Sequence, residues 1–138
     1  MAEPDQSPAR GLLDTSVVIA LDQLRASELP EEAAISTLTL AELAAGPHAT
    51  TDPEEQSRRQ DRLQRTETTF DPLPFDSAAA RAYGRVYAAV QAANRKPRGP
   101  RAVDLLIAAT AISADLPLFT RNPNDFKGLE HLLPVHGV

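Results

Sequence analysis

Cysteine and tryptophan are absent from the 138-residue chain, and four phenylalanines and two tyrosines are its only aromatic residues. Without cysteine, disulfides and thiolate zinc sites are excluded, and a reducing cytoplasm is the expected compartment. No apolar run approaches the roughly 20 residues that cross a bilayer, so no membrane segment is expected. Residues 1–10 are polar, carry two prolines and lack the apolar core of a secretory signal. We expect them to form a disordered tail.

A hydrophobic content of 42% and a charged content of 24% are ordinary for a globular protein. The length fits one domain, which we place at residues 11–138. The net charge of −5 argues against a protein that coats nucleic acid by bulk attraction. Although the net charge is negative, the chain contains one basic cluster, formed by Arg95, Lys96, Arg98 and Arg101. It is either a solvated loop or a local contact for a polyanion.

Short apolar runs alternate with helical patterns along the whole chain. Strands are predicted to end at Leu13 and to span residues 33–37, 116–120 and 132–135. Helices are predicted at 16–24, 39–45, 53–66, 77–94 and 102–114. This alternation predicts an α/β protein with three α/β/α layers, in which helices flank a short central parallel sheet.

Two helices carry clear start signals. Asp52 is followed by Pro53 and by Glu55 three residues after the cap, which predicts a capping box. Asp76 is predicted to cap the long helix that follows it. The apolar residues of that helix recur every three or four positions, which predicts one buried stripe, comprising Ala79, Tyr83, Val86, Val90 and Ala93.

Polar residues follow the predicted strands at equivalent places. Asp14 comes directly after the first strand, Glu42 lies in the helix after the second, and Asp104 lies early in the apolar helix. Asn122 and Asp125 follow the third strand. Each has a simple alternative: Asp14 as a helix cap, Glu42 in a capping box with the preceding threonine, Asp104 as a partner of the helix dipole, and the last two as turn residues. Taken together, they favour a site at the carboxyl edge of the sheet.

Asp104 carries most weight, because the apolar residues 105–109 follow it and residues 102–114 contain no basic side chain. A buried, unpaired carboxylate costs several kcal/mol, so it needs a cation or hydrogen-bond donors. If Asp14, Glu42 and Asp125 converge on it, a divalent cation is needed to keep all four ionised. Oxygen ligands without histidine suit Mg²⁺, with Mn²⁺ as a substitute. No phosphate-binding loop of the Gly-x-x-x-x-Gly-Lys type and no Gly-x-Ser-x-Gly motif is present.

Four motifs in this order resemble the PIN-domain ribonucleases, and more narrowly the VapC toxins of bacterial VapBC toxin–antitoxin pairs. They are Leu-Leu-Asp-Thr-Ser at 12–16, Thr-Leu-Ala-Glu-Leu at 39–43, Val-Asp-Leu-Leu-Ile-Ala-Ala-Thr-Ala at 103–111 and Phe-Thr-Arg-Asn-Pro-Asn-Asp-Phe at 119–126. The resemblance implies a PIN fold over residues 11–138. It also implies Mg²⁺-dependent endonucleolytic cleavage of RNA that leaves a 5′-phosphate and a 3′-hydroxyl.

Carried over by position, the resemblance makes Asp14, Glu42 and Asp104 metal ligands. The fourth family position is often aspartate but falls here on Asn122, so that Asp125 is expected to supply the missing charge, directly or through water. Three hydroxyl residues are expected to orient the carboxylates or bound water, namely Thr15, Ser16 and Thr120. The expected contacts to the RNA backbone are Arg95, Lys96, Arg98, Arg101 and Arg121.

The resemblance also implies a homodimer and a VapB-type antitoxin, whose C-terminal segment places an arginine among the acidic residues. Two alternatives remain open at this point. One is a PIN-like binding module whose acidic pocket mainly receives such a basic peptide. The other is a small-molecule phosphohydrolase on a related α/β scaffold.

Overall fold

The computed structural model describes residues 8–97, 99 and 101–138. The predicted tail at residues 1–7 and the predicted RNA contact Arg98 therefore lie outside the described residues. The centre of the fold is a four-stranded parallel sheet in the order β2-β1-β3-β4. Its strands are β1 (Arg10–Leu13), β2 (Glu32–Ala34), β3 (Leu118–Thr120) and β4 (Val135–Gly137).

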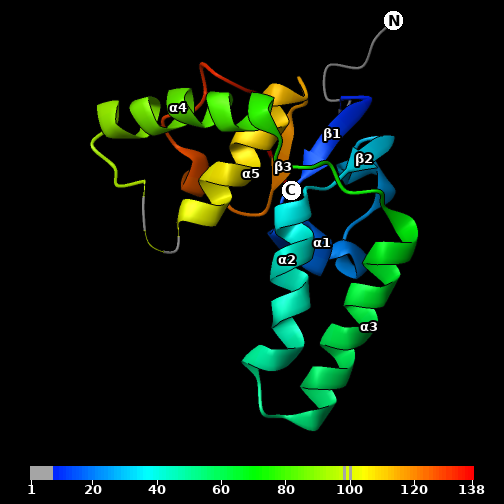
Figure 1. Cartoon of the computed structure of the whole chain (residues 1–138). Coiled ribbons are helices and arrows are strands. Elements are labelled where there is room, and N and C mark those ends of the chain that lie inside the picture. Colours follow the sequence, from blue (N-terminus) through cyan, green and yellow to red (C-terminus); the bar gives the residue numbers. More distant parts are fainter. Residues whose placement is uncertain (1–7, 98, 100) are drawn as a thin grey trace, which may run out of the picture.

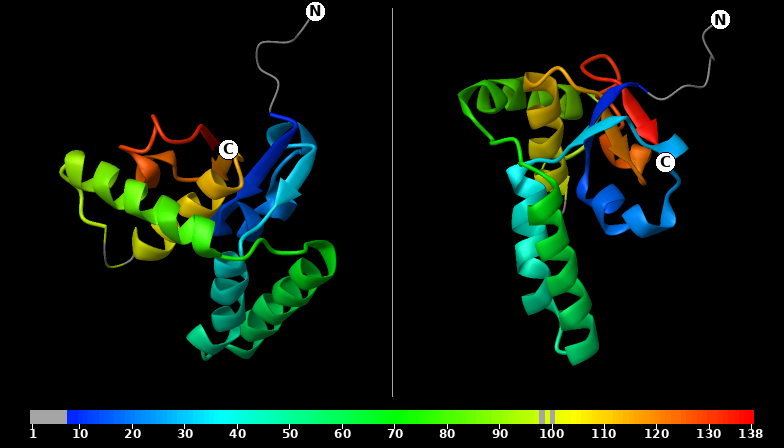
Figure 2. Two further views of the ribbon diagram at one scale, coloured as in Figure 1. Left: turned by 45° about the horizontal axis from the view of Figure 1, so that its top comes forward. Right: turned by 90° about the vertical axis from the view of Figure 1, so that its right-hand side faces the viewer.

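Helices cover both faces of this sheet (Figure 1). The α-helices are α1 (Thr15–Ile19), α2 (Thr37–Ala45), α3 (Pro53–Thr69), α4 (Ser77–Ala92) and α5 (Arg101–Ser113). Short 3₁₀ helices connect them: η1 (Leu21–Gln23), η2 (Ala26–Glu28), η3 (Gly46–Ala49) and η4 (Pro123–Phe126). Helices α4 and α5 pack against each other, whereas α2 and α3 form a hairpin that extends away from the sheet (Figure 2). The predicted three-layer α/β/α architecture is confirmed.

Alternation along the two central strands divides the core between the faces of the sheet. Leu12 and Leu118 point into the cluster formed with α4 and α5. Their neighbours Leu13 and Phe119 point into the opposite cluster, which includes buried residues of α1 and α2. All four side chains are at most 1% exposed. The strands are therefore buried on both faces, which is why they read as short apolar runs rather than as polar–apolar alternation.

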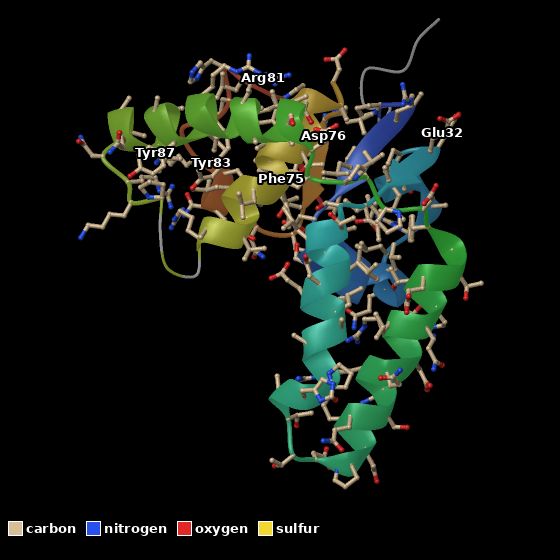
Figure 3. The ribbon with its side chains drawn as sticks, viewed as in Figure 1. Glu32, Phe75, Asp76, Arg81, Tyr83 and Tyr87 are labelled. Atoms are coloured by element: carbon tan, nitrogen blue, oxygen red, sulfur yellow. The ribbon has the colours of Figure 1, made fainter. Side chains whose placement is uncertain are left out.

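Helix α4 confirms its predicted cap, because the N–H of Ala79 donates to the Asp76 carboxylate at 2.9 Å. The predicted stripe is only partly correct. Ala93 ends the helix as its exposed C-terminal cap, and Tyr83 is half-buried. Figure 3 shows Tyr83 and Tyr87 on the opposite side of α4 from Arg81, and the two rings pack edge-to-face with centroids 6.1 Å apart. The smaller Ala82 and Ala89 are buried instead, because α4 lies close to α5.

Several predicted boundaries were wrong. The helix expected at 16–24 ends at Ile19 and continues as the separate turns η1 and η2. The last strand begins at Val135, because the residues before Pro134 form turns that bury Leu129 and Leu133 under the sheet. The capping box at Asp52 does not form, since its side chain makes no cap bond and Glu55 pairs with two arginines of its own helix. Among the described residues, no helix is long and apolar enough to cross a membrane.

The close approach of β1 to the Phe119 ring yields a stability prediction. A Cβ added at Gly11 would lie 2.5 Å from one ring carbon of Phe119 and 2.7 Å from another. The ring is stacked on His136 at 5.0 Å between centroids and therefore has little room to move. We expect Gly11→Ala to lower the free energy of unfolding in urea by about 1–3 kcal/mol. The control Gly84→Ala, where a Cβ meets nothing within 4 Å, should raise it by about 0.5–1 kcal/mol. Equal midpoints for the two variants would contradict this packing argument.

Candidate functional site

Asp14 lies at the carboxyl edge of the sheet, where its N–H donates to the Phe119 carbonyl at 2.9 Å and so continues the pairing of β1 with β3. The residue is only 4% exposed. Its side chain caps α1, because Oδ1 accepts from the Val17 N–H at 3.3 Å, and it also accepts from the Ser16 hydroxyl. The simple reading of Asp14 as a helix cap is thus correct. The cap bond occupies only one of its two carboxylate oxygens.

Hydroxyl groups connect the segments that meet at this edge. The Ser16 hydroxyl oxygen accepts from the Arg121 N–H at 3.1 Å, across 105 positions of sequence. Thr120 is fully buried, and its Oγ1 accepts from the Asn122 N–H at 2.9 Å. Ser16 therefore holds the end of β3 against Asp14, and Thr120 fixes the turn after β3. Both act on the backbone around the carboxylates.

Glu42 projects from the middle of α2, and its Oε1 accepts from the Thr15 hydroxyl. The Thr15 oxygen lies 3.0 Å from the hydroxyl oxygen of Thr39. An ionised carboxylate only accepts, so Thr15 donates to Glu42 and Thr39 donates to Thr15. The capping-box alternative for Glu42 is wrong, because α2 begins two residues before Thr39 and is capped by Ser36, whose Oγ accepts from the Leu38 N–H at 2.8 Å.

Thr39 is a site residue that the sequence analysis missed as such. It is fully buried, yet its hydroxyl is directed to the chain of hydroxyls that ends at Glu42. Its position one helical turn before Glu42 was the available signal, because residues three apart share a helix face. That spacing was interpreted as a capping box. Only the position of α1 beside α2 distinguishes the two interpretations.

Asp104 lies half-buried in the first turn of α5, and its pKa is raised from 3.8 to about 6. Burial is the largest cause, followed by the negative charges of Asp14, Asp125 and Glu42. Carboxylates from three other, distant parts of the sequence thus act on Asp104. The distribution of burial differs from the expectation, because Asp14 is the buried member whereas Asp104 is half-exposed and Glu42 exposed.

Arg101, which was predicted as an RNA contact, acts on Asp104. Helix α5 begins at Arg101, one residue earlier than predicted. The positive charge of Arg101 lowers the pKa of Asp104, whereas burial and the three carboxylates raise it. The statement that this helix contains no basic residue was therefore wrong. Arg101 and Asp104 are three residues apart and share one face of the first turn.

The two candidates for the fourth position of the site differ in their placement. Asn122 is exposed at the start of η4, and its side chain makes no cap bond. Asp125 is half-buried in η4, and its charge is felt by Asp104. Of the two, only Asp125 carries a charge that acts on Asp104. Asn122 directly precedes the first residue of η4.

The four predicted RNA contacts that lie within the described residues fall into two groups. Lys96 and Arg121 are exposed. The pKa of Glu28 is lowered mainly by the hydrogen bond from the Arg25 N–H, and the charge of Arg121 lowers it further. Arg95 and Arg101 are half-buried and donate to backbone carbonyls of η4. Only the first group presents its charge freely to a ligand in solution.

The chemistry of this cluster fits a hard divalent cation, because every side chain that acts on Asp104 apart from Arg101 is a carboxylate. As the side chains stand, no group of three or more Asp, Glu, His or Cys residues within the described chain is close enough to hold a metal ion. Mg²⁺ usually keeps several water ligands and binds one or two carboxylates directly. The more distant carboxylates can therefore contribute through water. The donor types fit Mg²⁺ without requiring three direct ligands.

Comparison with known proteins shows one consistent similarity. The PIN domain model matches residues 11–132. Ribonuclease VapC5 of Mycobacterium tuberculosis is 35% identical over 127 residues, which cover 90% of each chain. Ribonuclease VapC8 of the same species is 40% identical over 102 residues, covering 73% of this chain and 89% of the relative. The crystal structure of VapBC-5 from M. tuberculosis, a member of the VapBC family of toxin–antitoxin systems, superposes with a TM-score of 0.81 at 35% identity and covers 95% of this chain and 98% of its own.

The raised pKa of Asp104 predicts a pH-dependent cost in the metal-free protein. Between pH 4 and 6 the unfolded chain loses this proton while the folded chain keeps it, so the folded state loses stability as the pH rises, and the full cost is present above pH 6. In EDTA at pH 7.5, we expect Asp104→Asn to stabilise the protein by about 1–2 kcal/mol, after allowance for solvent screening of a half-exposed group.

The matched control is Asp71→Asn, which makes the same change at an exposed residue and should leave stability within about 0.5 kcal/mol. Urea unfolding at pH 4 and pH 7.5 measures both variants. The advantage of Asp104→Asn should disappear at pH 4. A variant that is less stable than the parent at pH 7.5 would show that the carboxylates do not repel one another.

Proposed function

Because this chain belongs to the PIN domain family and, within it, to the VapC ribonucleases, we propose that it is a Mg²⁺-dependent endoribonuclease and the toxin of a VapBC-type pair. The observation that carries the proposal is that separate elements bring acidic groups together. Thr15, next to Asp14, donates to Glu42, and the charges of Asp14, Asp125 and Glu42 all raise the pKa of the half-buried Asp104. Four acidic groups gathered at the carboxyl edge of a parallel sheet form the kind of site that binds a divalent ion and a phosphodiester.

Asp14, Glu42, Asp104 and Asp125 would hold the ion, with Asn122 beside them as a neutral ligand for water or phosphate. When bound, Mg²⁺ would lower the pKa of an attacking water and neutralise charge that develops on the phosphate. The chain's own contribution is to fix the carboxylates before the ion arrives. Ser16 and Thr15 achieve this by donating to Asp14 and Glu42, and Thr120 achieves it by holding the turn that follows β3.

RNA binding must overcome a net charge of −5, so local cations have to meet the phosphates. The exposed Lys96 and Arg121 are the described residues that fit this role best. The backbone N–H of Arg121 donates to the Ser16 hydroxyl, and that hydroxyl donates to Asp14. The position of Arg121 is therefore linked to that of Asp14. Arg98 remains a prediction of the same kind.

A VapB-type antitoxin is the proposed partner. Support comes from the similarity to VapBC-5 and from the acidity of the site itself, which would attract an arginine side chain of a basic peptide. A homodimer, which the resemblance also implies, remains part of the proposal.

A second candidate function is a binding module that receives such a peptide without catalysis. One observation favours it, namely that no three potential ligands among the described residues stand at metal-binding distance. Calorimetric titration separates the two functions. Saturable binding of Mn²⁺ to the parent and its loss in Asp104→Asn support the nuclease, whereas peptide binding in the absence of any metal binding supports the binding module.

The nuclease proposal predicts that cleavage of purified RNA depends on both the ion and Asp104. We expect EDTA to abolish cleavage, and added Mg²⁺ or Mn²⁺ to restore it. Asp104→Asn should lower the cleavage rate by at least about 100-fold, because it removes both a charge and a ligand from the site. Asp71→Asn should cleave like the parent. Undiminished activity in EDTA and in Asp104→Asn would refute the proposal.

The chain of hydroxyls that ends at Glu42 gives a finer test. Thr39→Val keeps the shape of the side chain but removes the hydroxyl that donates to Thr15. We expect the cleavage rate to fall by about 10-fold or more, since residues that orient a metal ligand typically have effects of this size. Thr39→Ser should recover most of the rate. Thr37→Val, at the half-buried first residue of the same helix, controls for a loss of helix stability and should leave the rate near that of the parent.

A further inference from the structure

Two arginines at opposite ends of the basic connection between α4 and α5 bind the same short helix. Arg95, just after the end of α4, donates from Nη1 to the carbonyl of Asn124 at 2.9 Å. Arg101, the first residue of α5, donates from Nη1 to the carbonyl of Asp125 at 3.1 Å. The two carbonyls are consecutive in η4. Guanidinium groups therefore connect the C-terminal end of α4 and the N-terminal end of α5 to η4. Charged donors of this kind make stronger hydrogen bonds to a carbonyl than neutral donors do.

Helix η4 is also held by contacts with α5 and β4 and by the turn that Thr120 fixes. It is a single 3₁₀ turn of four residues, and a turn of this length is not stable by itself. Its apolar anchor is Phe126, which is 1% exposed and packs in the core cluster of α4 and α5. Asp125 stands next to this anchor in the chain, half-buried, on the segment whose carbonyls the two arginines bind. The guanidinium bonds are the polar contacts that hold the Asn124 and Asp125 backbone to the end of α4 and the start of α5.

We propose that Arg101 is a positioning residue for the acidic site: by binding the Asp125 carbonyl, it holds η4 against the start of α5 and keeps the Asp125 carboxylate beside Asp104. This role rests on the proposed nuclease function and refines it. It replaces the expectation that Arg101 grips RNA. A cation that meets phosphate in solution needs free donors and exposure, as Lys96 has, whereas Arg101 is half-buried and already bonded to the protein.

The electrostatics agree with this geometry. Arg101 lowers the pKa of Asp104 while Asp125 raises it, so both charges are felt at the same carboxyl group. A guanidinium is always ionised, so Arg101 keeps its full charge while it donates to the Asp125 carbonyl. Arg101 thus supplies a fixed positive charge inside a cluster of negative ones. Without it, repulsion from Asp104 would favour movement of Asp125 and η4 away from α5.

The decisive experiment compares Arg101→Gln, Asp125→Asn and the double variant in RNA cleavage, with kcat and KM measured separately. If Arg101 acts through Asp125, Arg101→Gln lowers kcat by about 10-fold, and in the Asp125→Asn background it changes kcat by less than about twofold. Lys96→Gln serves as the comparison for a phosphate contact and should raise KM. Arg85→Gln, at an exposed position of α4, is the control and should leave both constants unchanged.

A role in gripping RNA gives the opposite pattern. Arg101→Gln would then raise KM, leave kcat unchanged, weaken the salt dependence of binding and add fully to Asp125→Asn, and the proposal would be overturned. Amide hydrogen exchange in the RNA-free protein supplies a readout that does not depend on activity. We expect exchange in residues 122–127 to accelerate about 10-fold in Arg101→Gln, but not in Arg85→Gln, while exchange in β1 and β3 stays as in the parent.

Unchanged exchange in residues 122–127 would refute the positioning role. If the parent protein fails to cleave RNA at all, the proposed function fails, and the exchange measurement still decides the role of Arg101.

Discussion

Electrostatic repulsion between carboxylates at one edge of the sheet is the constraint on which the site depends. The parallel strands end together, so that the residues after them cannot avoid each other. Asp14, Glu42 and Asp125 all act on the half-buried Asp104, whose pKa is raised to about 6 as a result of burial and of their charges. A fold selected only for stability would not concentrate like charges in this way. The arrangement therefore favours the proposed role of a positively charged ligand.

The chain keeps these groups together with bonds that do not neutralise them. Hydroxyls of Ser16 and Thr15 donate to Asp14 and Glu42, and such bonds orient a carboxylate while leaving its charge available. Arg101 is the exception, because it brings a full positive charge close to Asp104. Its guanidinium donates to the Asp125 backbone carbonyl of η4, and this bond leaves the carboxylates free for an ion.

Sequence patterns predicted the parallel sheet and the four acidic positions, because both follow from local rules. Apolar runs that end in an aspartate identify strand ends, and strand ends of a parallel sheet share one edge. The same rules failed where a neighbouring segment decides the outcome. Glu42 has the spacing of a capping box, but α1 lies beside α2 and supplies Thr15 as its partner. Arg101 belongs to a basic run that indicates an exposed loop, yet η4 lies within its reach.

The sequence by itself determined the order of the elements, the two apolar faces of the strands and the identity of the acidic residues. These depend on periodicity and on the chemistry of single side chains, which the linear chain records. Tertiary structure decided the hydrogen-bond partners of those residues: Ser16 with the Arg121 backbone, Thr15 with Thr39, and Arg101 with Asp125, at separations of 105, 24 and 24 positions. The physical reason is that a hydrogen bond forms only within about 3.5 Å, and only the packing of helices on the sheet brings such distant groups that close.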